Sequence, residues 1–386
     1  MILRQIYLDN SSTTKVLDEA AQAVFDVMTV QYGNPSSLHR KGIEAEKIMR
    51  QAREKVAQAL GVNPREIYFT SGGTESNNWA IKGAAYSLRR RGEHIITTSI
   101  EHPSVLEVFG ALEREGFKVT YLKVDKEGFI DTDELKGALT PETVLVSIMY
   151  VNNEVGSIQP IKEAAEAIKA YNKNILFHVD AVQAFGKIPL VLSLEGIDLL
   201  SLSGHKIYGP KGVGALFAKD KVRIDPLLLG GGQEAGLRSG TENLPGIAGL
   251  GVAVDICINN ITKWQRKMAE LRKQLMDGIL TNITDTVVNG SSLGAPHILN
   301  VSFLGTRGEI LLHALEAKGI YVSTGSACSS NKSGKSHVLK AMGKSPEEQD
   351  SALRFSLSHD LSPEDMDYTI QVLAKEVKEI RKFVRR

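Results

Sequence analysis

Short apolar runs rich in β-branched residues alternate with helical segments from Ile67 to Ala218. Apolar residues at three- and four-residue spacing, as from Ala45 to Ala59, indicate amphipathic helices, whereas the runs themselves indicate strands. Strands that alternate with helices form a mainly parallel sheet covered on both faces. The expected strands lie at 67–69, 95–98, 119–122, 144–151, 175–179, 199–202 and 214–218.

The pattern changes near residue 226, where glycine-rich loops precede a long amphipathic stretch at about 245–280. A strand (298–303), a helix (307–318), two short strands (321–323 and 353–357) and a terminal helix are expected after it. The last helix opens at Ser362, an N-cap residue followed by Pro363. We therefore expect an α/β protein with a large domain over 15–255 and a smaller α/β domain over 256–386. The N-terminal arm, 1–14, can pack on either domain, and we assign it to the smaller one.

The composition excludes several classes of protein. Lys plus Arg is 46 and Asp plus Glu is 45, so the net charge of +1 argues against a protein built to grip nucleic acid or an anionic membrane. Two cysteines, Cys257 and Cys328, exclude a disulfide framework and a four-thiolate metal site, and no metal is expected. The first residues lack the apolar region of a signal peptide, which predicts a cytoplasmic enzyme.

Polar residues follow five of the expected strands. Taken singly, each cluster has an ordinary structural explanation, such as a tight turn, a helix cap or a buried histidine. Ligands in open parallel sheets bind beyond the carboxyl ends of the strands, so the fold brings these clusters to one crevice. The clusters are at 70–76, at 101–104, at 152–154, at Asp180 with Gln183, and at 203–206.

Asp180 and Lys206 make the chemistry more specific. A lysine after one strand and a carboxylate at the end of another are what pyridoxal phosphate requires. The lysine forms a Schiff base with the cofactor, and the carboxylate keeps the pyridine nitrogen protonated. The phosphate would lie at the helix N-terminus that begins at Gly73 and Thr74. Nucleotide-binding patterns of the G-x-G-x-x-G or P-loop kind do not occur at the expected places.

Seven segments in family order resemble the motifs of cysteine desulfurases of the NifS/IscS type. The resemblance covers essentially the whole chain and implies a fold-type I pyridoxal-phosphate enzyme of aminotransferase class V, with a seven-stranded sheet in the large domain. It also implies a homodimer with the active site at the subunit interface. The segments are 7–10, 70–77, 151–156, 178–183, 203–212, 238–243 and 326–330.

The resemblance implies a role for each matching residue. Lys206 would carry the cofactor, Asp180 would pair with its pyridine nitrogen, and Gln183 would bond its ring hydroxyl. His102 would stack on the ring and move protons. The remaining positions are Gly73, Thr74, Ser203 and His205 for the phosphate, Thr241 reaching it from the partner subunit, Asn153 for cofactor or substrate, and Arg354 for the substrate carboxylate.

Cys328 is the implied nucleophile. L-cysteine would lose its sulfur to this thiolate, giving L-alanine and a persulfide that passes to a sulfur-acceptor protein. The polar, glycine-punctuated segment 324–335 predicts a mobile loop around Cys328. Cys257 lies in an apolar helical pattern instead, which predicts a buried, inert thiol.

Two departures from the family pattern limit the resemblance. Ser12 stands where the family usually has alanine, a change that we interpret as structural. The sequence also stops at Arg386, without the further tail with which housekeeping members dock the iron–sulfur scaffold. Iron–sulfur assembly, tRNA thiolation and other cofactor pathways therefore stay open as destinations of the sulfur.

Three other functions stay open. Another class V enzyme, either a selenocysteine lyase or an aminotransferase, is the nearest alternative; an aminotransferase needs no thiol such as Cys328. A non-catalytic sulfur carrier or adaptor would need only Cys328, so the presence of Lys206, Asp180 and Arg354 argues against it.

Overall fold

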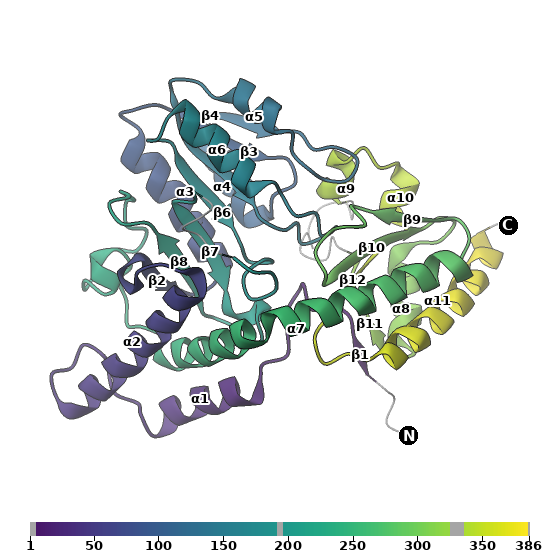
Figure 1. Ribbon diagram of the computed structural model, residues 1–386, viewed down its shortest axis with the longest axis horizontal. Coiled ribbons are helices and arrows are strands. Elements are labelled where there is room, and N and C mark those ends of the chain that lie inside the picture. The colour runs from purple at the N-terminus through teal and green to yellow at the C-terminus, as the bar shows by residue number, and fades with distance from the viewer. Residues whose placement is uncertain (1–4, 191–195, 325–335, 385–386) are drawn as a thin grey trace.

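The computed structural model describes residues 5–190, 196–324 and 336–384. Within them, seven strands form the central sheet in the order β2-β8-β7-β6-β5-β3-β4 (Figure 1). Neighbours from β7 to β4 are parallel, whereas β8 runs antiparallel to both β2 and β7, so the mainly parallel sheet is confirmed. The strands are β2 (Ile67–Thr70), β3 (His94–Thr98), β4 (Lys118–Leu122), β5 (Thr143–Met149), β6 (Leu176–Asp180), β7 (Leu199–Ser203) and β8 (Gly214–Ala218).

This sheet carries apolar side chains on both of its faces, and helices therefore cover both faces. Ile95 and Ile96 are neighbours in β3, yet they belong to different hydrophobic clusters, because successive side chains of a strand point to opposite faces. One face packs against α3 (Gly73–Leu88) and α4 (Pro103–Arg114). The other packs against α2 (Arg40–Leu60), α5 (Thr132–Ala138), α6 (Ile161–Tyr171) and the start of α7 (Leu244–Asn282).

A second hydrophobic core is built mostly from the C-terminal third of the chain. Its antiparallel sheet has the order β12-β10-β9, and α8 and α11 pack beside it. Strand β1 (Ile6–Tyr7) joins this unit by pairing in parallel with β11 (Ile320–Tyr321). The other elements are β9 (Thr286–Asn289), β10 (Ile298–Phe303), α8 (Gly308–Glu316), α9 (His337–Ala341), α10 (Pro346–Asp350), β12 (Ala352–Ser356) and α11 (Pro363–Val384).

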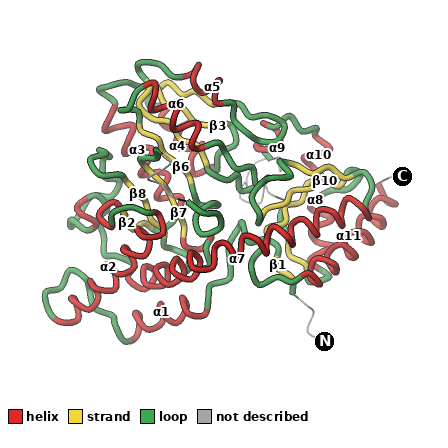
Figure 2. Tube along the Cα trace, in the orientation of Figure 1, coloured by secondary structure: helices red, strands yellow, loops and turns green. Residues whose placement is uncertain are grey.

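Helix α7 (Leu244–Asn282) joins the two cores (Figure 2). Its first half buries Leu250 and Val254 against the large sheet, and its second half buries Leu271 and Leu275 in the second core. Helix α1 (Asp18–Thr29) packs along it. Among the residues described above, α7 alone is long and apolar enough to cross a membrane, yet 56% of its most apolar window is buried inside the protein.

Several short elements differ from the sequence-based expectations. Strand β5 ends at Met149, two residues early, and β11 ends at Tyr321, where only Ser323 continues with an isolated bridge to Arg354. The expected N-cap of the last helix is present, since the backbone N–H of Asp365 donates to Ser362 Oγ at 3.3 Å. Strand β9 and helices α9 and α10 were not expected. The division into domains at 15–255 stays a prediction.

Two helical glycines provide a test of the packing between α7 and α11. A Cβ at Gly278 of α7 would lie 2.2 Å from Ile370 Cδ1 and 2.9 Å from Ile370 Cγ1, whereas a Cβ at Gly137 of α5 would meet nothing within 4 Å. Gly278→Ala should therefore lower the free energy of unfolding by about 1–3 kcal/mol, because it overpacks this contact. Gly137→Ala, the matched control, should raise it by about 0.5–1 kcal/mol through helix propensity. Urea unfolding measures both, and equal effects would contradict the packing.

Candidate active site

A cavity of about 250 Å³ lies beyond the carboxyl ends of β5, β6 and β7. The strand-end clusters singled out in the sequence therefore do meet in one place. Ten of the predicted site residues line this cavity: Gly73, Thr74, His102, Asn153, Asp180, Gln183, Ser203, His205, Lys206 and Arg354. The sequence analysis had assigned no site role to the other lining residues, which are Ser11, Ser12, Asn77, Ser104, Met149, Val151 and Val182.

Asp180 ends β6 and is buried, yet it has the partners that a buried carboxylate needs. Asn77 Nδ2 donates to its Oδ2 at 2.7 Å, and the backbone N–H of Val182 donates to its Oδ1 at 3.0 Å. Asn77 comes from α3, so a residue that the sequence had quoted only within a motif fixes this carboxylate. Two held oxygens at the cavity wall fit a protonated ring nitrogen.

The start of α3 fits a phosphate. A Cβ on Gly73 would lie 2.6 Å from Val182 Cγ2, so no larger residue fits there without a shift. The buried Ser203 Oγ beside it has no hydrogen-bond partner within the described residues. Burial and the charges of Lys206 and Lys211 lower the pKa of His205 to about 4, so its ring is neutral at neutral pH. A buried hydroxyl without a partner next to a helix N-terminus suits an anionic oxygen.

Lys206 and Gln183 are both held by the N-terminal arm. Lys206 Nζ donates to the carbonyl oxygens of Ser11 and Ser12, at 2.6 Å each. Gln183 Nε2 donates to the same Ser11 oxygen at 2.9 Å. Residues just after β1 therefore hold Lys206, which follows β7, and no pattern in the sequence indicated this contact.

Lys187 is a buried cation that the sequence did not mark. Its Nζ donates to Gln183 Oε1 at 3.3 Å. Burial, with the charges of Lys206 and Arg354, lowers the pKa of Lys187 to about 7. This contact fixes which end of the Gln183 amide carries the oxygen, and leaves its Nε2 as the donor.

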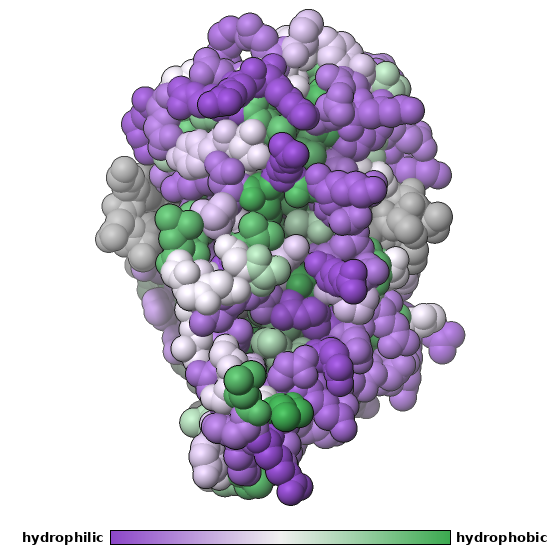
Figure 3. All heavy atoms as spheres, turned by 90° about the vertical axis from the view of Figure 1, so that its left-hand side faces the viewer, coloured by the Kyte–Doolittle hydropathy of each residue, from purple (hydrophilic) through white to green (hydrophobic). Residues whose placement is uncertain are grey.

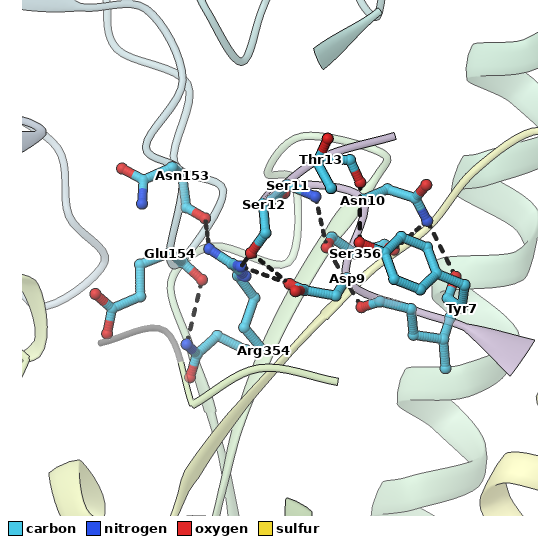
Figure 4. A network of polar contacts seen from close by, with 12 residues as sticks. Tyr7, Asp9, Asn10, Ser11, Ser12, Thr13, Asn153, Glu154, Arg354 and Ser356 are labelled. Atoms are coloured by element: carbon cyan, nitrogen blue, oxygen red, sulfur yellow. Dashed lines mark hydrogen bonds and ion pairs between the residues drawn. The ribbon is translucent and has the colours of Figure 1, made fainter. Parts of the chain in front are cut away.

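Arg354 reaches the cavity from β12 of the second sheet (Figure 4). Its Nη1 donates to the carbonyl oxygen of Asn153 at 2.9 Å. Its Nη2 contacts Asp9 Oδ1 and Ser12 Oγ, at 2.7 Å each. The side chain is 4% exposed, so its charge is largely desolvated and its position is fixed by these partners.

His102 caps α4 from the cavity wall. Its Nδ1 accepts a hydrogen bond from the backbone N–H of Ser104 at 3.1 Å and lies 2.8 Å from Ser104 Oγ. Burial lowers the pKa of His102, although the Asp180 carboxylate opposes the shift. A neutral imidazole with one nitrogen engaged by a helix N-terminus can still exchange a proton at the other nitrogen.

Thr241 lies apart from this cavity. It lines a smaller cavity of about 90 Å³ together with Phe69 and Arg238. Arg238 Nε donates to Glu75 Oε1 at 2.8 Å, which ties the segment that carries Thr241 to the first turn of α3. Within one chain, Thr241 therefore does not join the other predicted phosphate ligands.

The two cysteines differ as far as the structure describes them. Cys257 in α7 is fully buried, as predicted, and burial raises the pKa of its thiol to about 12. Cys328 lies outside the described residues. The described chain on either side of it is near the cavity: Ser323 exchanges backbone hydrogen bonds with Arg354, and the Ser336 side chain hydrogen-bonds to Glu154.

The aminotransferase class-V family model matches residues 6–369 of this sequence. The chain belongs to this family. Two relatives named cysteine desulfurase IscS are similar over nearly the full length of the chain. The protein from Clostridium botulinum strain Hall is 47% identical over 383 residues, which cover 98% of this chain and 96% of the relative. The protein from Methanosarcina thermophila is 48% identical over 379 residues, which cover 98% and 93%.

Two solved structures are also similar to this chain over most of its length. A NifS-like protein superposes with a TM-score of 0.91 at 42% identity and covers 98% of this chain and 100% of its own. SspA in complex with cysteine has a TM-score of 0.82 at 37% identity, with 92% and 99% covered. The predicted fold-type I architecture, the predicted cofactor pyridoxal phosphate and the predicted cysteine desulfurase activity are thereby confirmed.

Glu101, next to His102, should make the free energy of unfolding depend on pH. Its buried Oε1 accepts from Thr98 and Met149, whereas burial raises the pKa of this carboxyl from 4.5 to about 8. Between these two values the folded chain holds a proton that the unfolded chain has released, so the free energy of unfolding falls as pH rises.

Glu101→Gln should remove that contribution, since the amide does not titrate. Relative to the unchanged protein, the free energy of unfolding of the variant should increase from pH 5 to pH 8 and then level off. Urea titrations at several pH values measure it. Glu113→Gln, at an exposed position, controls for the loss of one acidic group, and a constant difference across this range would refute the prediction.

Proposed function

We propose that this chain takes the sulfur of L-cysteine onto Cys328 and releases L-alanine. The observation that carries the proposal is the cavity itself, because it places Lys206 and Asp180 from the large sheet beside Arg354 from the small one. A lysine, a carboxylate and an arginine around one cavity suit an amino acid bound next to pyridoxal phosphate.

Five kinds of contact would hold the cofactor. Asp180 would accept from the pyridine nitrogen, the free N–H of Gln183 Nε2 would donate to the ring hydroxyl, and His102 would lie against the ring. Lys206 would bond its aldehyde carbon. The phosphate would lie among Gly73, Thr74, Ser203 and His205. When bound, pyridoxal phosphate supplies an electron sink for the substrate Cα.

Residues of the chain itself would bind the substrate, transfer protons and attack the sulfur. Arg354 would bind the substrate carboxylate, and Asn153, whose carbonyl oxygen accepts from Arg354, would border the substrate. Lys206 Nζ would take the proton from Cα, and His102 would exchange a proton at its unengaged nitrogen. The Cys328 thiolate would attack the substrate sulfur, forming an S–S bond as the Cβ–S bond breaks. Protonation at Cβ and return of a proton to Cα would then complete alanine.

We further propose a homodimer in which Thr241 serves the partner's phosphate site. Its place in a separate cavity supports this, because its own chain leaves it away from Gly73. Hydrophobic side chains gather in patches on the face that Figure 3 shows, and exposed patches of this kind favour a covered surface. Large apolar side chains are exposed at α1 and ahead of Thr241. They are Phe25, Met28, Val30, Leu227, Leu228 and Leu229.

A sulfur-acceptor protein would take the persulfide. An iron–sulfur scaffold and a tRNA-thiolation enzyme are both acceptors of the proposed chemistry. We propose that the enzyme is cytoplasmic, because a chain with only two cysteines is not expected to rely on disulfides. Residues 15–255 would form the large domain, with 1–14 and 256–386 as the small one.

Adding L-cysteine to the purified enzyme tests the proposal. Alanine should form, and peptide mass spectrometry should find the extra sulfur on Cys328. Cys328→Ala should keep the cofactor absorbance yet make no protein persulfide, whereas Cys257→Ala, the matched control, should still carry it on Cys328. Persulfide formation in the Cys328→Ala variant would reassign the nucleophile, and turnover of selenocysteine alone would favour a selenocysteine lyase.

Removing the arginine clamp gives a separate test. Arg354→Ala should raise KM for L-cysteine roughly tenfold to hundredfold, because a desolvated, charge-assisted contact to the carboxylate is lost. Steady-state alanine production measures it. Arg307→Ala provides the control, since that side chain is 73% exposed and is not among the residues that line the cavity. An unchanged KM in Arg354→Ala would exclude the clamp.

A further inference from the structure

The hydroxyl of Ser12 lies between Arg354 and Asp9 (Figure 4). It donates to Asp9 Oδ1 at 2.8 Å and accepts from Arg354 Nη2 at 2.7 Å. Since Nη2 also donates to Asp9 Oδ1 at 2.7 Å, the three atoms form a nearly equilateral triangle. Both acceptors are therefore crowded around one amino group of the guanidinium.

The donors of Arg354 show why this amino group matters. A guanidinium binds a carboxylate with two parallel N–H groups, either Nε with Nη2 or Nη1 with Nη2. Nε has no hydrogen-bond partner within the described residues, and Nη1 donates one of its hydrogens to the carbonyl oxygen of Asn153. Either pair includes Nη2, so every two-pronged contact with a carboxylate needs a donor that Asp9 and Ser12 already share.

The two acceptors differ in how they face the cavity. Ser12 lines it together with Arg354, whereas Asp9 is not among the lining residues. A carboxylate that enters from the cavity therefore meets Nη2 on the Ser12 side. Asp9 is also a charged partner, and its contact with the guanidinium is the stronger of the two.

We propose that Ser12 is a specificity-determining residue, whose hydroxyl fills the place of one substrate carboxylate oxygen on Arg354 until an amino acid displaces it. The inference rests on the proposed clamp role of Arg354. Displacement needs no loss of the Ser12 donor, because the hydroxyl can keep its hydrogen bond to Asp9. The hydroxyl thus weakens the binding of every carboxylate-bearing ligand and leaves amines that lack a carboxylate unaffected.

Ser12→Ala should consequently tighten the binding of carboxylate-bearing ligands. In the variant, the ligand carboxylate no longer has to replace the hydrogen bond between Ser12 and Arg354. Removing the need to break one such hydrogen bond should raise the affinity about threefold to tenfold. The substitution keeps the backbone carbonyl that accepts from Lys206, so it leaves the lysine contact in place. Ser12→Thr restores a hydroxyl and should return the affinity toward that of the unchanged enzyme.

The experiment titrates the cofactor-loaded enzyme with L-alanine and with ethylamine, which is alanine without its carboxylate, and follows the cofactor absorbance. Dissociation constants are compared for the unchanged enzyme, Ser12→Ala, Ser12→Thr and Arg354→Ala, and thermal melting confirms that each is folded. For Ser12→Ala we expect L-alanine to bind about threefold to tenfold more tightly and ethylamine to bind as before.

The Arg354→Ala variant separates the two proposals. If it abolishes the preference for L-alanine over ethylamine while Ser12→Ala leaves L-alanine binding equal or weaker, the role of Ser12 is refuted and the clamp stands. If Arg354→Ala leaves the preference unchanged, the clamp is refuted and the role of Ser12 falls with it. Tighter ethylamine binding in Ser12→Ala would also overturn the inference, because it would indicate a general change of the cavity.

Discussion

Helix α7 is buried in two hydrophobic cores at once, and the position of the two walls of the active-site cavity depends on this packing. Its first half packs on the large sheet and its second half on the small one. Each fully buried leucine or valine contributes about 1.5–3 kcal/mol, so neither half can leave its core cheaply. The continuous helix therefore fixes the distance between Lys206, at the end of β7, and Arg354, in β12.

Charge is arranged around the cavity so that cations outnumber anions. Lys206 and Arg354 line it, against Asp180 as the only acidic residue among the described lining residues. Each cation has a polar partner, and burial drives Lys187 toward its neutral form. An anionic cofactor and an anionic substrate group both suit such a surface, since they compensate charges that the fold has already removed from water.

The sequence allowed the large sheet and most of the cavity wall to be predicted, for a physical reason. Asp180 and Ser203 directly follow apolar runs, and parallel strands deliver their ends to one edge. Arg354 could be placed only through the family resemblance, because it comes from a different sheet. The contact of Ser12 with Arg354 could not be predicted, since no local pattern encodes a pairing between segments so far apart. Lys187 was missed because burial of a lysine depends on tertiary packing. The roles of these residues stay predictions.

The N-terminal arm has a consequence for how the enzyme is made. Asp9 and Ser12 precede Arg354 by 345 and 342 residues, yet the three groups share one set of hydrogen bonds. During synthesis the arm therefore leaves the ribosome long before Arg354 does. Such distant contacts form late, after loop closure over nearly the whole chain. A nascent chain can thus fold its large sheet while the cavity is still incomplete, since the cavity wall is completed only once β12 has been made.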